Sequence, residues 1–198
     1  MKKIFFFVFS FALCQNIYNG QINFDYIGTE NGYFNSLIED SLKTGILINQ
    51  ENNDSSLIIM TSFMEREDSN YDIFFSILQD TIFPVQERFW EIPGEGNENN
   101  PLSLEALTLF IPAIDSSFAI EIFNVLNDSS NSNDSNNLTE YLETIFIELS
   151  DYLYIGLSGE INFYAVTDST IAGEFNIIMI KPTFNFPPHM ITIENGSI

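Results

Sequence analysis

Cysteine and histidine are almost absent from this sequence of 198 residues. Cys14 is the only cysteine, so no disulfide can form within one chain. His189 is the only histidine, and it stands beside Pro187 and Pro188 at the expected start of a strand. No nucleophile motif accompanies it, so we interpret it as a structural or solvated side chain. We therefore predict no catalytic residues and a protein that is not an enzyme.

Basic residues are also scarce, because only 6 lysines and arginines stand against 28 aspartates and glutamates. The formal net charge of -22 repels phosphate backbones and anionic headgroups, which argues against nucleic acid and acidic membrane surfaces as partners. Basic partners and divalent cations are favoured instead. The simplest interpretation of the charge is solubility alone, because net charge does not specify a fold.

Apolar stretches long enough to cross a membrane, which takes ~20 residues, are missing as well. The N-terminus instead has the arrangement of a signal peptide. Lys2 and Lys3 precede the apolar stretch Ile4–Leu13, and Ala12 and Cys14 are the small residues of a cleavage site. We therefore predict that residues 1–14 are removed and that the protein is exported to the periplasm, the outer envelope or the exterior.

Removal of that segment takes away two lysines and no acid, which leaves 4 basic and 28 acidic residues and a net charge of -24. A lipid anchor on Cys14 is the alternative to simple cleavage. Leu13 argues against an anchor, because the residue before an acylated cysteine is normally glycine, alanine or serine.

Apolar and polar side chains alternate through much of the remaining chain, which contains many of the 20 phenylalanines. The alternation predicts three consecutive strands near the C-terminus, at Gly159–Val166, Ile171–Ile180 and His189–Ile193. Shorter strands are expected before them, at residues 21–27, 32–38, 45–48, 56–63, 71–78, 89–92 and 107–111. This pattern predicts a mainly β (α+β) fold, an antiparallel β-sandwich or half-open barrel, in a single domain over residues 15–198.

The middle of the chain changes to a helical period. Asp115 or Ser116 can cap a first helix whose apolar stripe includes Phe118 and Ile122. A second apolar stripe follows at residues 138–149, after a capping box that starts at Asn137. We therefore predict a helical hairpin inserted at about residues 115–150, packed over one face or one open end of the sheet.

Between the two expected helices, residues 127–137 consist only of asparagine, serine and aspartate. Asp128, Asn131, Asn133 and Asp134 offer the hard oxygen ligands that calcium prefers. The segment lacks the glycine of an EF-hand loop, and a solvated loop is the simpler interpretation. Calcium is therefore the one cofactor that the sequence makes possible.

The C-terminal motifs resemble a known group of proteins. Ser158-Gly-Glu-Ile161, the segment Thr167–Phe175 and Ile191-Thr-Ile-Glu-Asn-Gly196 are similar to the last strands of uncharacterised exported bacterial β-domain proteins. The resemblance covers about the last forty residues. It implies export and a β fold and brings no catalytic residues. Because those proteins usually continue the last strand, it also implies that the natural chain extends past Ile198.

We expect a non-catalytic, strongly acidic interaction or structural module, whose partner is an unknown protein or envelope component. One alternative is a carrier that holds a hydrophobic ligand inside a barrel or sandwich, with the helices as a lid. A further alternative is a calcium-dependent adhesion or carbohydrate-active module, for which Trp90 is the sugar-stacking candidate.

Overall fold

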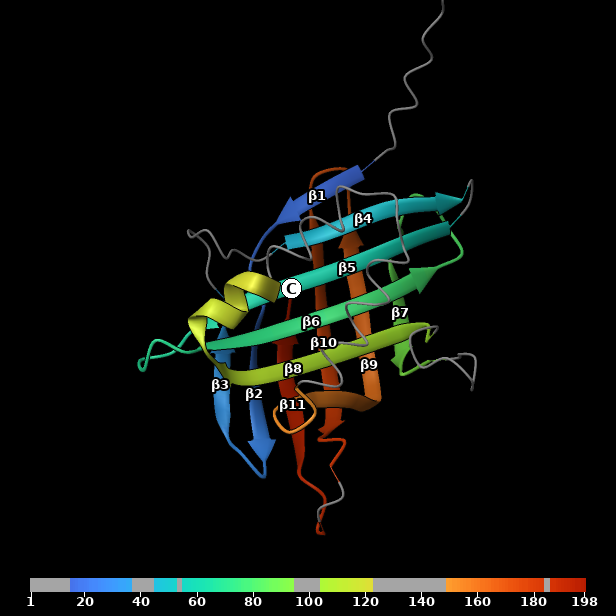
Figure 1. Ribbon diagram of the computed structural model, residues 1–198. Coiled ribbons are helices and arrows are strands. Elements are labelled where there is room, and N and C mark those ends of the chain that lie inside the picture. Colours follow the sequence, from blue (N-terminus) through green and yellow to red (C-terminus); the bar gives the residue numbers. More distant parts are fainter. Residues whose placement is uncertain (1–14, 37–44, 53–54, 95–103, 123–148, 184–185) are drawn as a thin grey trace, which may run out of the picture.

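The computed structural model describes residues 15–36, 45–52, 55–94, 104–122, 149–183 and 186–198 (Figure 1). The chain is mainly β, and its 11-stranded antiparallel sheet curls into a half-barrel, which confirms the predicted fold class. The strands are β1 (Gln15–Asn19), β2 (Asn23–Gly28), β3 (Gly32–Asn35), β4 (Gly45–Asn52), β5 (Ser55–Glu65), β6 (Tyr71–Asp80), β7 (Arg88–Ile92), β8 (Ala106–Ile114), β9 (Tyr154–Val166), β10 (Ile171–Ile180) and β11 (Met190–Ser197).

The sheet turns a corner at β9. Neighbouring strands follow the order β1-β4-β5-β6-β8-β9-β10-β11-β2-β3, and β7 also pairs with β9. Only Tyr154 and Ile155, at the start of β9, pair with β8, while the rest of β9 pairs with β10 and β7. We call β1, β4, β5, β6 and β8 the front layer, and β2, β3, β7, β9, β10 and β11 the back layer. Figure 1 shows the front strands crossing those behind them.

Strands from the two ends of the sequence meet in the back layer. β11 pairs antiparallel with β2, with Ile193 opposite Tyr26 and Thr192 opposite Ile27. β2 in turn pairs with β3 through a short hairpin. The N-terminal hairpin therefore completes a layer that otherwise consists of C-terminal strands and β7.

The main core lies between the layers and is filled by aromatic rings. The Phe24 ring of β2 stacks on Phe34 with the ring centroids 4.7 Å apart. It also meets Phe74 of β6 at 5.3 Å, Phe110 of β8 at 5.5 Å and Phe175 of β10 at 5.8 Å. All five rings are buried. Rings from both layers therefore touch one another directly, and their burial holds the layers together.

A second core covers the other face of the front layer. Alternate residues of β6 point to opposite faces, so that Phe74 belongs to the main core and Phe75 to the second. Ala119 and Ile122, from a helix at residues 116–122, are buried in this second core. Because both faces of β6 and β8 are covered, the sequences of these two strands are nearly continuous runs of apolar residues.

Each predicted strand corresponds to a strand of the structure, but several ends differ: β9 begins at Tyr154 and not at Gly159, and β11 continues past Ile193 to Ser197. β1 was not predicted, and it pairs with β4 from Gln15 to Asn19. The strand expected to end before Pro112 continues to Ile114 as β8. Ala113 adopts a φ of 57°, and the pairing register with β6 shifts there, which accommodates the missing N–H of the proline.

The predicted helical hairpin is not supported, because the described residues contain one helix. That helix has the predicted cap: Asp115 Oδ1 accepts the Ser117 N–H at 2.7 Å and the Phe118 N–H at 3.4 Å. Most of the second predicted stripe, residues 138–148, lies outside the described residues. Leu149, at its end, is buried in the second core.

The ring cluster predicts a large difference between two phenylalanine substitutions. Phe74→Ala removes a fully buried ring and should lower the free energy of unfolding by about 3–5 kcal/mol. Phe89→Ala, at a ring that is 57% exposed, is the matched control and should change it by about 0.5 kcal/mol. Urea unfolding followed by circular dichroism measures both, and equal losses would contradict the packing described above.

Candidate functional site

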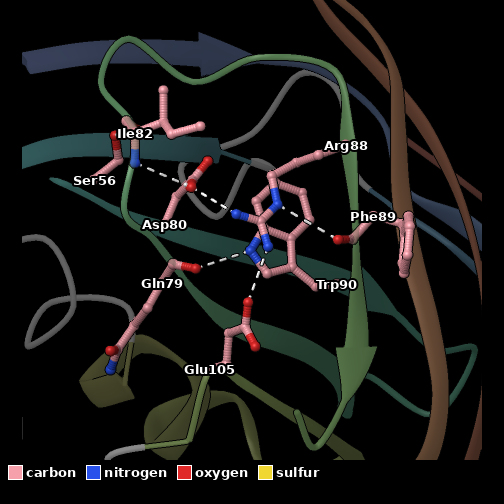
Figure 2. Close-up of polar contacts among 8 residues, drawn as sticks. All are labelled: Ser56, Gln79, Asp80, Ile82, Arg88, Phe89, Trp90 and Glu105. Carbon is pink, nitrogen blue, oxygen red and sulfur yellow. Dashed lines mark hydrogen bonds and ion pairs between the residues drawn. The ribbon is translucent and has the colours of Figure 1, made fainter. Parts of the chain in front are cut away.

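One cluster of polar side chains surrounds Arg88 of β7, as Figure 2 shows. The Arg88 guanidinium donates to Asp80 Oδ1 at 2.6 Å and to Glu105 Oε1 at 2.9 Å. It also lies over the Trp90 ring, 4.7 Å from the ring centroid. Trp90 is fully buried and donates its indole N–H to the Gln79 carbonyl oxygen at 2.9 Å. Trp90 is thus a core residue and not an exposed platform for a sugar.

We interpret the Arg88 cluster as a clamp between the layers. The Asp80 side chain is fully buried, whereas that of Arg88 is 28% exposed. Asp80 Oδ1 also accepts the Ile82 N–H at 3.1 Å, while Oδ2 has no hydrogen-bond partner among the described residues. The buried carboxylate therefore depends on the Arg88 charge. Because the Arg88 charge is already shared by Asp80 and Glu105, and Asp80 is buried, the cluster offers little to a ligand.

Loss of the Arg88 charge alone should be costly. Arg88→Met leaves the buried Asp80 carboxylate without its counter-charge, and we expect a loss of about 3 kcal/mol in the free energy of unfolding. Asp80→Asn combined with Arg88→Met removes both charges and should recover most of that loss.

Glu105→Gln is the control for this cluster, because Glu105 is 36% exposed and its ion pair with Arg88 is partly screened. We expect it to cost less than about 1 kcal/mol. Denaturant unfolding of the three variants measures these differences. A double variant as unstable as Arg88→Met would show that Arg88 acts by packing rather than by charge.

The second candidate is an open cleft of about 460 Å³ where the β2–β3 hairpin meets the turn between β5 and β6. We call it the hairpin cleft. Its lining consists of tyrosines, acidic side chains, one arginine and small or polar neighbours: Tyr26, Asn31, Gly32, Tyr33, Met64, Glu65, Arg66, Glu67, Asp68 and Asp72.

The turn after β5 is built by its own polar groups. The Arg66 N–H donates to the Asn70 carbonyl oxygen at 2.8 Å, and the Asn70 N–H donates to Asp68 Oδ1 at 3.1 Å. Ser69 adopts a φ of 63°, the left-handed conformation that reverses the chain here. The hydrogen bonds from Asn70 lower the pKa of the Asp68 carboxyl. Asp68 therefore remains charged at the mouth of the cleft.

Arg66 is neutralised by a buried carboxylate in the cleft wall. Its guanidinium donates to both oxygens of Asp72, at 3.1 and 3.3 Å, and the Asp72 side chain is fully buried. Asp72 Oδ1 also accepts the N–H of Ala113 at 2.8 Å, which stabilises the left-handed residue of β8. Burial raises the pKa of the Asp72 carboxyl, and the hydrogen bonds from Ala113 and Arg66 oppose that shift.

Tyr26 of β2 forms the buried part of the cleft wall. A Cβ atom at residue 32 would overlap the Tyr26 hydroxyl group. The Tyr26 ring can therefore lie across β3 only because residue 32 is glycine. Burial raises the pKa of the Tyr26 hydroxyl, the Asp72 carboxylate raises it further, and the Arg66 guanidinium opposes part of the shift.

The β2–β3 hairpin is tied to the back layer through Glu30. Glu30 Oε1 accepts the Tyr154 hydroxyl at 3.0 Å and the Lys181 ammonium at 3.1 Å. The same ammonium lies 4.7 Å from the Tyr154 ring centroid. Burial raises the pKa of the Tyr154 hydroxyl well above its ordinary value, and its hydrogen bond to Glu30 adds to the shift.

The hairpin cleft is suited to a positively charged group. Four carboxylates and one guanidinium line it, and that guanidinium is paired with Asp72. Glu65, Glu67 and Asp68 are exposed beside Tyr33, whose side chain is 65% exposed. Carboxylates and the face of an exposed aromatic ring are the groups that bind ammonium and guanidinium ions.

The sequence-predicted sites lie elsewhere. Asp128, Asn131, Asn133 and Asp134 lie outside the described residues, as does Cys14, so calcium binding and the lipid anchor stay predictions. His189 is half-buried just before β11, where its carbonyl oxygen accepts the Lys181 N–H at 3.0 Å. In the described part of the chain, no three acidic, histidine or cysteine residues gather as a metal site would require.

The hairpin cleft was missed because its residues come from two hairpins that are distant in the sequence. Two signals could have found it. Arg66 is a lone basic residue within the acidic turn, and Asp72 is an acid at the start of a mostly apolar strand. An arginine among acids and an acid among apolar residues are the expected halves of a buried ion pair.

No protein-family model matches the sequence, and neither a curated protein nor a solved structure matches it. Within the described ranges, no helix has the length and hydropathy needed to cross a membrane. The assignment of a function therefore depends on the residues of this chain.

The tyrosine pKa shifts predict a weakening of the fold at alkaline pH. A phenol whose pKa is raised in the folded state stabilises it fully below the unfolded value of about 10, and this contribution is lost as the pH rises above it. Tyr154→Phe should therefore lose less stability than the wild type between about pH 8 and about pH 11.

Urea unfolding at the two pH values measures this difference. Tyr164→Phe is the control, because its ring is 54% exposed and its replacement disturbs no buried contact. If Tyr154→Phe and the wild type lose the same stability, ionisation of the Tyr154 hydroxyl does not contribute to alkaline unfolding.

Proposed function

We propose that the protein is an exported, strongly acidic interaction module whose hairpin cleft receives a positively charged side chain of a partner protein. The main support for this proposal is the composition of the cleft wall, where the exposed acids Glu65, Glu67 and Asp68 lie beside the exposed ring of Tyr33. Arg66 does not compete for them as a free cation, because it is paired with Asp72.

A lysine or arginine side chain has the right chemistry for this cleft. Its charged head accepts no hydrogen bonds and donates several, which suits a wall of carboxylate oxygens. The Tyr33 ring adds a cation–π contact at its exposed face. The net charge of -22 attracts a basic partner from a distance and orients its approach.

The structure gives no support to the hydrophobic-carrier alternative. A carrier needs an apolar cavity of roughly 300–1,000 Å³. The described interior between the layers is instead occupied by phenylalanine rings with centroids 4.7 to 5.8 Å from that of Phe24. The interaction module is therefore the function that the geometry favours.

The experiment is an NMR titration of the protein with the N-acetyl methylamides of lysine and arginine. Binding is expected to shift the signals of Tyr33 and of the turn at residues 65–70, and to be weak because one side chain makes few contacts. Glu67→Gln should weaken binding by about two- to fivefold, the contribution of one exposed charge pair. N-acetyl glutamate methylamide should not bind.

Glu87→Gln is the matched control, because it removes the same charge from an exposed position outside the cleft lining. Glu87→Gln should leave the affinity for the lysine and arginine amides unchanged if contacts within the cleft bind them. Equal weakening in the two variants would show that only the overall charge attracts the cation, and the proposal would then be wrong.

A further inference from the structure

The outer face of the back layer carries a row of acids that runs across its strands. The pairing register places Glu91 of β7 opposite Glu160 of β9, and Asp25 of β2 opposite Glu194 of β11. Asn176 of β10 pairs with Glu160 in the middle of the same row. All five side chains are exposed. We call the four carboxylates the acidic row; like charges placed directly opposite one another are destabilising.

No basic side chain in the described part of the chain compensates the acidic row. Arg66, Arg88 and Lys181 are each held in an ion pair elsewhere. The other three basic residues, Lys2, Lys3 and Lys43, lie outside the described residues. The opposed carboxylates therefore have an electrostatic cost that a bound cationic partner would remove.

A row of apolar side chains lies next to the acidic row. Ile178 of β10 pairs with Thr192 of β11, and Thr192 pairs with Ile27 of β2. Ile27 is 53% exposed, Ile178 is 39% exposed, and Leu157 of β9 is 49% exposed. We call Leu157, Ile178 and Ile27 the apolar row. Ile178 and Ile27 stand two residues from Asn176 and Asp25, so on β10 and β2 the two rows are about 7 Å apart. Leu157 lies in a bulge of β9, next to Ser158, which is the residue that pairs with Ile178.

We propose that these two rows dock a basic amphipathic helix of a partner protein, which lies across the strands. A helix rises about 5.4 Å per turn, close to the spacing of about 4.8 Å between neighbouring strands. Lysines or arginines on successive turns therefore face successive strands, and they meet the four carboxylates on β7, β9, β11 and β2 and the amide of Asn176 on β10. Leucine-like residues on the adjacent side of the helix cover the apolar row.

The docking face is continuous with the hairpin cleft. Asp25 in the acidic row pairs with Tyr33 of β3, and Tyr33 also lines the cleft. A basic residue beyond the end of the docked helix can therefore reach the cleft. The inference rests on the proposed function for the basic character of the partner, and it adds the shape of the docking segment and a second surface.

The negative charge of this face argues against two other possible binding partners. A second copy of the chain, related by two-fold symmetry, brings its own acidic row toward this one. A membrane surface with anionic headgroups is repelled in the same way. A basic helix alone complements both rows.

Calorimetry with a designed probe tests the inference. The probe is a 16-residue helical peptide, about 24 Å long and so as long as six strands are wide, with lysines along one side and leucines along the adjacent side. We expect it to bind the protein and to bind less tightly as salt is added. A peptide of the same composition with the residues scrambled, and one with glutamate in place of lysine, should not bind.

Two double variants measure separately how much the apolar row and the acidic row contribute to binding of the peptide. Ile27→Thr with Ile178→Thr keeps strand-forming residues and should raise the Kd of the peptide about tenfold. Asp25→Asn with Glu160→Gln removes one member of each opposed pair, so it should keep or raise the melting temperature while weakening binding. If the isoleucine double variant fails to fold, the charge double variant still tests the inference.

Glu67→Gln, in the hairpin cleft, separates this inference from the proposed function. The 16-residue probe should bind this variant as it binds the wild type. If face variants bind the helix as tightly as the wild type does, the inference is overturned, whatever the cleft binds. If the helical peptide binds the docking face but neither the lysine amide nor the arginine amide binds the cleft, the inference is supported and the proposed function of the cleft is wrong.

Discussion

Contact between phenylalanine rings of opposite layers is the interaction on which the rest of the structure depends. Phe24 reaches Phe74 and Phe110 of the front layer and Phe175 of its own, so one ring connects strands that are not neighbours in the sheet. The β8–β9 corner alone has two paired residues on each strand, which is little to hold the layers in place. Burial of the rings closes the half-barrel, and only a closed half-barrel brings the β2–β3 hairpin to the turn after β5.

The three basic residues in the described part of the chain all form ion pairs within the structure. Arg66 and Arg88 compensate the buried carboxylates Asp72 and Asp80, and Lys181 holds Glu30 at the β2–β3 hairpin. A buried carboxylate without a cation is expensive, whereas an exposed one is solvated by water. The described cations therefore lie where the fold needs them, and the exposed acids of the cleft and of the docking face are left to attract charge from outside.

Alternation of side chains was enough to predict the hairpins, because one face of most strands is buried. The closing strands β9, β10 and β11 and the Asp115 cap follow from local patterns. β1 has only five residues and one clear apolar position, Ile17, so no period could be recognised in it. Arg66 and Asp72 left a signal of an ion pair in the sequence, but the positions of the cleft and of the docking face could not be predicted, because both depend on pairing between distant segments. Glu91 meets Glu160 only through the β7–β9 register.

The pairing of β2 with β11 has a consequence for the order in which the chain folds. The strands β4, β5 and β6 follow one another along the sequence, and β8 joins them after the short strand β7. The β2–β3 hairpin, in contrast, has no neighbouring strand in the back layer until Met190–Ser197 is present. Long-range pairing of this kind slows folding, since a loop of more than a hundred residues must close first. The back layer, with the cleft and the docking face that it carries, is therefore completed last. A chain still being synthesised can hold a formed front layer while its binding surfaces do not yet exist.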